Sequence, residues 1–129
     1  MSFLPVTTTF FAALHDASVE HFLFDALRGR LLLTLLLDSD KSPSHCQQQI
    51  VLSGIHNGAD VEQVQRVVNA ALANSSRPKL EYRLDEFYLL PKDASDCLQG
   101  SLSVRLTIDH LPPLQLHCQK ITRREVNLT

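Results

Sequence analysis

The sequence has no tryptophan, and only four of its 129 residues are glycines and three are cysteines. The glycines are too scattered to form a phosphate-binding loop, as the positions of Gly29, Gly54, Gly58 and Gly100 show. Ser53-Gly54 lacks the glycine pattern of a nucleophile elbow. With no tryptophan and an aromatic fraction of only 6%, the sequence offers few side chains on which nucleic-acid bases would stack. The familiar signatures of nucleotide binding and serine hydrolysis are therefore missing.

The sequence also lacks a large excess of charge of one sign. It has 12 Lys and Arg against 14 Asp and Glu, which gives a formal net charge of -2 and a pI near 6.3. Proteins that bind DNA or RNA carry a basic face, because attraction to phosphates dominates their affinity. We therefore expect no nucleic-acid partner. A hydrophobic fraction of 44% and a charged fraction of 20% are typical of a globular protein, and the length predicts a single domain over residues 1–129.

The three cysteines, Cys46, Cys97 and Cys118, are odd in number and far apart, so a disulfide framework is not expected. Residues 1–5 show no basic region and no apolar run of an export signal. The longest apolar run, Leu31–Leu37, is too short to span a bilayer. These features predict a cytoplasmic protein in a reducing compartment, with no membrane partner.

Three strands are expected in the first half of the chain. Residues 19–26 alternate loosely, and Arg28-Gly29 turns the chain into the run Arg30–Leu37, which is apolar on both faces and predicts a central strand. A loop rich in Asp, Ser and Pro follows at 38–44, and a third strand is predicted at 48–55.

A helix is expected over residues 61–73. Asp60 is the predicted N-cap, and Gln63 would complete a capping box. The apolar residues recur at spacings of three and four and form one stripe, made of Val61, Val64, Val67, Val68, Ala71 and Leu72. Asn74 and Pro78 are expected to end the helix.

Three more strands are expected in the second half, at 79–90 with a bulge at Asp85-Glu86, at 99–109 and at 114–121. Residues from about 122 are expected to be a short flexible tail. The order predicts an α+β fold with a mostly antiparallel sheet of about six strands (βββ-α-βββ) and one amphipathic helix packed on one face. Residues 7–14 fit a helical turn or an edge strand equally well.

Histidines and acids near the N-terminus allow an acid-base or metal-site interpretation, with His15, Asp16, His21 and Asp25 as its members and His56 as a further candidate. If 19–26 is a strand, His21 and Asp25 lie roughly 13 Å apart along it, from a rise of about 3.3 Å per residue. They cannot both contact one metal ion unaided. Asp16 capping a turn, with solvated histidines, is the competing structural interpretation.

The pairs His45-Cys46 and His117-Cys118 combine two zinc-ligand types, but neighbouring residues of a strand point to opposite faces. Cys97 has no visible neighbour that would lower the pKa of its thiol. We therefore expect no metal, no cofactor and no enzymatic activity.

A mixed-charge polar face is predicted if the last three strands are adjacent. Such a face is often merely solvated, but it can also set the specificity and association rate of a protein partner. The residues expected to contact that partner are Asp85, Glu86, Arg105, Asp109 and His117.

Several short segments resemble small bacterial immunity proteins found beside polymorphic toxins. These are the opening Leu14-His15-Asp16-Ala17-x-Val19, Phe24-Asp25 before a leucine-rich strand, the stretch Ile50-Val51-Leu52-Ser53-Gly54-Ile55, and Leu114-x-Leu116-x-Cys118. The chain departs from that pattern in having a helix directly after Ile55. The resemblance implies a cytoplasmic protein that binds and blocks a toxin, and it brings no catalytic residues.

Three hypotheses follow from the sequence. The first is a non-enzymatic binding protein that neutralises a cognate toxin. The second is a small enzyme with a His/Asp site near His15 and Asp16, to which His56 would contribute. The third is a chaperone-like or structural homodimer in which an exposed strand edge pairs with its symmetry mate.

Overall fold

The computed structural model describes residues 17–37, 46–74, 79–90 and 102–127. In these ranges it contains seven strands and one helix, which confirms the α+β class but corrects the expected strand count of about six. In chain order they are β1 (Ser18–Asp25), β2 (Arg30–Leu37), β3 (Cys46–Ser53), α2 (Gly58–Ala73), β4 (Tyr82–Leu89), β5 (Leu102–Ile108), β6 (Leu114–Cys118) and β7 (Lys120–Asn127).

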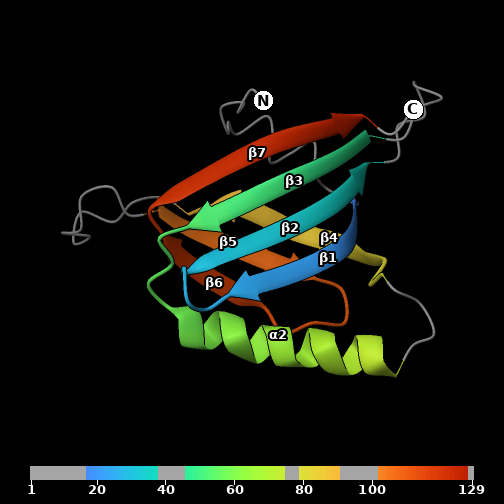
Figure 1. The fold of residues 1–129 in the computed structure, drawn as a ribbon, viewed down its shortest axis with the longest axis horizontal. Coiled ribbons are helices and arrows are strands. Elements are labelled where there is room, and N and C mark those ends of the chain that lie inside the picture. The colour runs from blue at the N-terminus through green and yellow to red at the C-terminus, as the bar shows by residue number, and fades with distance from the viewer. Residues whose placement is uncertain (1–16, 38–45, 75–78, 91–101, 128–129) are drawn as a thin grey trace.

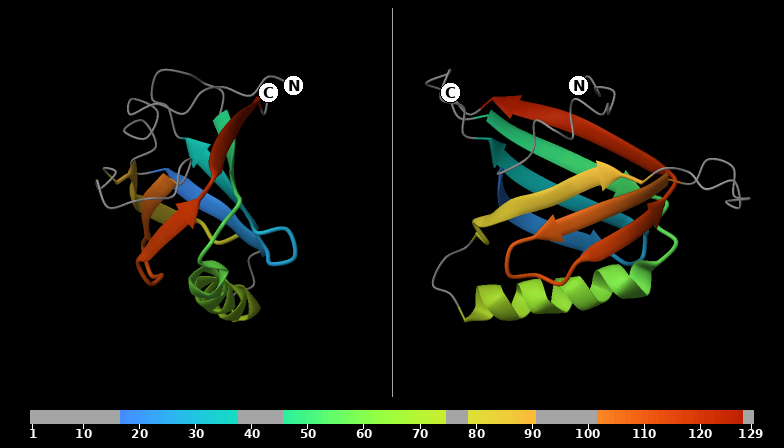
Figure 2. Two further views of the ribbon diagram at one scale, coloured as in Figure 1. Left: turned by 90° about the vertical axis from the view of Figure 1, so that its left-hand side faces the viewer. Right: turned by 180° about the vertical axis from the view of Figure 1, so that it is seen from behind.

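The strands form one antiparallel sheet in the order β6-β5-β4-β1-β2-β3-β7. Its two edge strands, β6 and β7, are consecutive in the chain, with only Gln119 between them. The sheet therefore folds over on itself into two layers, one of β1, β2, β3 and β7 and the other of β4, β5 and β6 (Figures 1 and 2). The layers join where β1 pairs with β4 at just two positions, Ser18 with Arg83 and Val19 with Tyr82.

The core lies between the two layers and is built from alternate residues of each strand. In β5 and β6 the expected alternation is confirmed, because Val104, Leu106, Leu114 and Leu116 are buried. In β2 only one face is fully buried, since Leu31, Leu33 and Leu35 have no exposed surface whereas Leu32 and Leu36 are partly exposed. The even-numbered leucines thus belong to the outside of the sheet.

The helix α2 lies alongside β1 and β6 and covers the core from that side (Figure 1). Its predicted apolar stripe is confirmed in Val61, Val64 and Val68, which are buried in the core cluster.

The predicted start of the helix is wrong. The helix begins at Gly58, so Asn57 takes the N-cap position and Asp60 lies in the first turn. The side chain of Asn57 makes no capping bond, because its amide is engaged by the backbone of β6. An adjacent strand therefore decides how this helix begins.

The predicted flexible tail from about 122 is also wrong, because β7 pairs with β3 along eight residues, from Ser53 with Lys120 to Cys46 with Asn127. The sequence Lys-Ile-Thr-Arg-Arg-Glu-Val-Asn lacks the alternation of apolar and polar residues that would predict a strand. An edge strand does not require this alternation, since it need bury only a few side chains. The predicted bulge at Asp85 is confirmed by a register shift between Leu84 and Glu86.

Within the described ranges, no helix has both the length and the apolar character needed to cross a bilayer.

Candidate functional site

The predicted polar face exists as a set of neighbouring side chains, because β4, β5 and β6 are adjacent in the sheet. Cross-strand pairing places Tyr88 beside Arg105 and Arg105 beside Gln115, all on the outside of this layer. We call this surface the meander face and define it by Arg83, Asp85, Glu86, Tyr88, Ser103, Arg105, Thr107, Asp109, Gln115 and His117. It contains all five residues predicted to contact a partner.

One end of the meander face carries an ion pair. Nε of Arg83 lies 3.2 Å from Oδ2 of Asp109, and the backbone N–H of Asp109 donates to the carbonyl of Arg83 at 3.0 Å. The side chains are 55% and 37% exposed, so the pair contributes only about 0–1 kcal/mol to folding stability. Its main effect is to hold two opposite charges at a fixed place on the surface.

Further along the face, polar side chains bond across the strands. The hydroxyl of Thr107 donates to Oε1 of Glu86 at 3.4 Å. The hydroxyl of Ser103 lies 3.0 Å from Nδ1 of His117. Both contacts join opposed residues of adjacent strands, which limits the freedom of the acid and of the imidazole.

The backbone of His117 is fixed from the opposite side by the segment that leads into α2. Its N–H donates to the side-chain oxygen of Asn57 at 2.9 Å, and its carbonyl accepts from the N–H of His56 at 2.7 Å. Sequence reasoning missed this contact, because His56 and Asn57 are far from His117 in the chain and carry no motif.

The proposed acid-base cluster is dispersed in the part that the structure describes. His15 and Asp16 lie outside the described residues. His21 is opposite Thr34 in the β1–β2 ladder, and His56 is an exposed residue after β3. No group of three His, Cys, Asp or Glu side chains that could hold a metal ion occurs in the described ranges.

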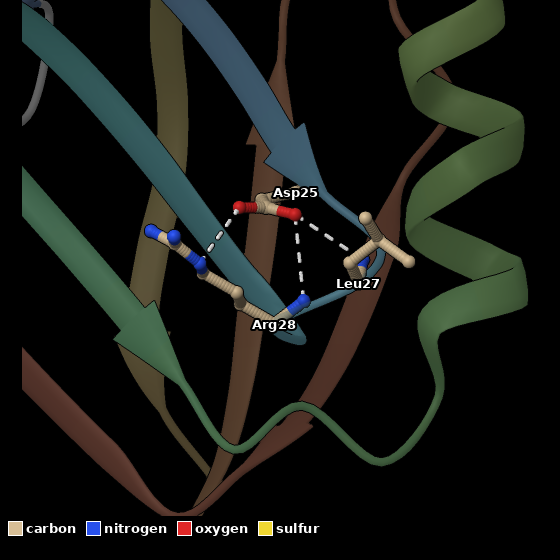
Figure 3. Close-up of polar contacts among 3 residues, drawn as sticks. All are labelled: Asp25, Leu27 and Arg28. Atoms are coloured by element: carbon tan, nitrogen blue, oxygen red, sulfur yellow. Dashed lines mark hydrogen bonds and ion pairs between the residues drawn. The ribbon is translucent and has the colours of Figure 1, made fainter.

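Asp25 organises the β1–β2 turn (Figure 3). Its Oδ1 accepts the N–H groups of Leu27 at 3.2 Å and Arg28 at 3.4 Å, and its Oδ2 lies 3.8 Å from Nε of Arg28. An aspartate that accepts backbone N–H groups two and three residues on is typical of a turn. This position therefore has a structural role.

The two residues of the His117-Cys118 pair point to opposite faces, as strand geometry predicts. His117 is half-buried on the meander face, whereas Cys118 is fully buried in the core. Burial raises the pKa of the Cys118 thiol from 9.0 to about 11, and a hydrogen bond with the backbone of Lys120 opposes that rise. Cys118 is thus a protonated, apolar core residue near neutral pH. Cys97 lies outside the described residues.

A second surface was not predicted from the sequence. The outer face of β1, β2, β3 and β7 carries two adjoining hollows, of about 360 and 260 Å³. Their apolar lining includes Leu23, Leu32 and Val51. The leucine run of β2 is visible in the sequence, but nothing there showed that Leu32 and the other even-numbered leucines face outward.

Comparisons of the chain with protein-family models and with curated proteins find no match. The described residues carry fixed charges of both signs on the layer of β4, β5 and β6. On the layer of β1, β2, β3 and β7 they form an apolar surface bordered by cationic side chains. Both arrangements suit recognition of another macromolecule.

Proposed function

We propose that this protein is a non-enzymatic cytoplasmic binding protein that neutralises a cognate bacterial toxin, and that the meander face contacts the toxin. The observation that carries the proposal is the cross-strand arrangement of charges of both signs on this face. The ion pair of Arg83 with Asp109 and the Glu86 carboxylate lie on the same three-stranded layer as Arg105.

Rigidity is what makes such a face useful for binding. Glu86 and His117 are restrained by neighbouring hydroxyl groups, and β5 is paired with β4 on one side and with β6 on the other. Side chains that are already ordered lose less conformational entropy when a partner binds. A fixed pattern of opposite charges also rejects partners with a mismatched pattern.

The choice of a toxin as the partner is supported by the resemblance to immunity proteins. The segment Ile50-Val51-Leu52-Ser53-Gly54-Ile55 belongs to the end of β3 and the turn after it. There Gly54 adopts a φ of +67° and Ile55 donates its N–H to the carbonyl of Gly29 at 3.1 Å. The motif thus occupies the place where β3 leaves the sheet and heads towards α2.

The test is co-expression of the full chain with the product of the reading frame next to its gene. We expect that product to stop growth by itself and the wild-type chain to restore growth. The variant Asp109→Arg should lose protection, whereas Glu62→Arg, which makes the same change of charge on the exposed side of α2, should keep it. A harmless neighbouring product, or full protection by Asp109→Arg, would contradict the proposal.

A homodimer is the alternative that a specific observation favours. β7 is an edge strand, and among the described strands it pairs with β3 alone. Such an edge can add a strand from a second copy. Light scattering after size-exclusion chromatography decides this, since a monomer at every concentration rules the alternative out.

A further inference from the structure

The outer face of the β1-β2-β3-β7 layer, which is turned towards the viewer in Figure 1, has an apolar row across its strands. The ladders place Leu23 opposite Leu32, Leu32 opposite Val51, and Val51 opposite Thr122. Leu23 is 55% exposed, although it sits in the middle of a strand. Leu32 and Val51 are partly exposed, so the three side chains form a continuous apolar strip. Adjoining apolar residues at a surface are a common mark of an interaction site.

A charged row runs parallel to the apolar row, two residues away from it along each of the four strands. It consists of Asp25 opposite Arg30, Arg30 opposite Ser53, and Ser53 opposite Lys120. Asp25 is engaged by the N–H groups of the β1–β2 turn and by Arg28. The row therefore presents mainly the positive charges of Arg30 and Lys120.

Both rows line the two hollows, which share the lining residues Arg30 and Val51 and so adjoin on one surface. We call it the leucine groove. The larger hollow is lined by Leu23, Phe24, Asp25, Arg30, Leu32 and Val51, and the smaller one by Arg30, Val51, Ser53, Lys120 and Thr122. Four strands about 4.8 Å apart make the groove roughly 14 Å wide.

We propose that the leucine groove binds an acidic protein segment, which places apolar side chains over Leu23, Leu32 and Val51 and carboxylates beside Arg30 and Lys120. Charge complementarity selects this occupant. A small ligand is usually enclosed by its pocket, whereas these two hollows are partly open on the outer face of a sheet.

An anionic membrane suits the groove less well. Membrane-binding basic clusters commonly contain about 4–8 Lys and Arg. The two rows contribute only Arg30 and Lys120, which is fewer than such a cluster contains. The inference goes beyond the proposed function, because it assigns a second contact to the other layer of the sheet.

The experiment is an NMR titration of the full-length ¹⁵N-labelled chain with two short capped peptides, one alternating leucine with glutamate and the other alternating leucine with lysine. The glutamate peptide should shift amide signals of β1, β2, β3 and β7 saturably, and it should bind at least about tenfold more tightly than the lysine peptide, a difference of about 1.4 kcal/mol. Arg30→Glu should abolish this preference. Arg66→Glu, an equal change of charge on the exposed side of α2, should preserve it.

Four outcomes would overturn the proposal. They are equal binding of both peptides, absence of saturable shifts, shifts confined to the meander face, and co-sedimentation with phosphatidylserine vesicles without peptide binding. Because the readout uses neither a toxin nor the meander face, failure here leaves the proposed function standing. Conversely, loss of toxin protection by Asp109→Arg would not affect the groove.

Discussion

The side-chain oxygen of Asn57 accepts a hydrogen bond of 2.9 Å from the backbone nitrogen of His117, 60 positions later in the chain. The Nδ2 of the same amide donates to the carbonyl of Gln115 at 2.6 Å. One side chain therefore occupies both a donor and an acceptor on the edge of β6, as a neighbouring strand would. This contact fastens the start of α2 to the strand that carries His117.

Replacing Asn57 with alanine should destabilise the protein by about 1–3 kcal/mol, because the Gln115 carbonyl and the His117 N–H would both lose their partner. Urea unfolding followed by circular dichroism measures the change. Asn69→Ala is the matched control, since the Asn69 side chain is exposed and, among the described residues, bonds only within α2 to Gln65. A loss no larger for Asn57→Ala than for Asn69→Ala would refute the role assigned to Asn57.

Gly54→Ala should be more destabilising than Gly29→Ala. Both glycines have a positive φ, +67° and +60°, so both variants carry backbone strain of about 1 kcal/mol. Only at Gly54 would the new Cβ come within 2.8 Å of Cβ of Gln119, whereas at Gly29 the nearest atoms are 3.6 Å away. Thermal unfolding should rank wild type, Gly29→Ala and Gly54→Ala in falling order, and an equal loss for both variants would show that the close approach to Gln119 is unimportant.

Lys79→Met should destabilise the protein by about 1 kcal/mol, because it leaves the Glu20 carboxylate, whose side chain is only 6% exposed, without the Lys79 ammonium 3.5 Å away. The double variant Glu20→Gln/Lys79→Met removes the buried charge as well and should recover part of the loss. Denaturant unfolding of the four proteins in this double-mutant cycle gives the interaction energy. Strict additivity would mean that the two charges do not interact.

The raised pKa of Cys118 predicts a loss of stability in alkali. Below pH 9 the thiol is protonated in both the folded and the unfolded state, so it contributes no pH dependence. Between pH 9 and about 11 the unfolded chain loses this proton first, so the free energy of unfolding falls, by about 2–3 kcal/mol in the limit. Unfolding curves of wild type and Cys118→Ala should therefore converge as pH rises through this window. Parallel curves would show that Cys118 titrates normally.

The sequence predicted those parts of the fold that depend on local periodicity. Alternation located β5 and β6, the leucine run located β2, and the spacing of valines located α2. The bulge at Asp85 was visible as a change of phase within β4. These features depend on neighbours in the chain, which the sequence displays directly.

The remainder depends on contacts between distant residues. β7 is a strand because it pairs with β3, and its own residues do not alternate. The Asn57 side chain bonds to the backbone of β6 and so does not cap α2, and the start of the helix was therefore predicted at the wrong residue.

The two candidate surfaces differ in the same respect, since one could be predicted from local patterns and the other depends on distant contacts. The members of the meander face could be listed once three consecutive strands were recognised. The leucine groove needed the register of four strands, of which β7 joins from the far end of the chain. No local pattern reports such a register.

The central claim is that the meander face binds a toxin. Isothermal titration calorimetry of the full-length chain against the product of the neighbouring reading frame tests it most directly. We predict a dissociation constant in the nanomolar range for wild type and Glu62→Arg, and a loss of at least about tenfold, or 1.4 kcal/mol, for Asp109→Arg. Absence of binding by wild type, or unchanged affinity of Asp109→Arg, would contradict the account.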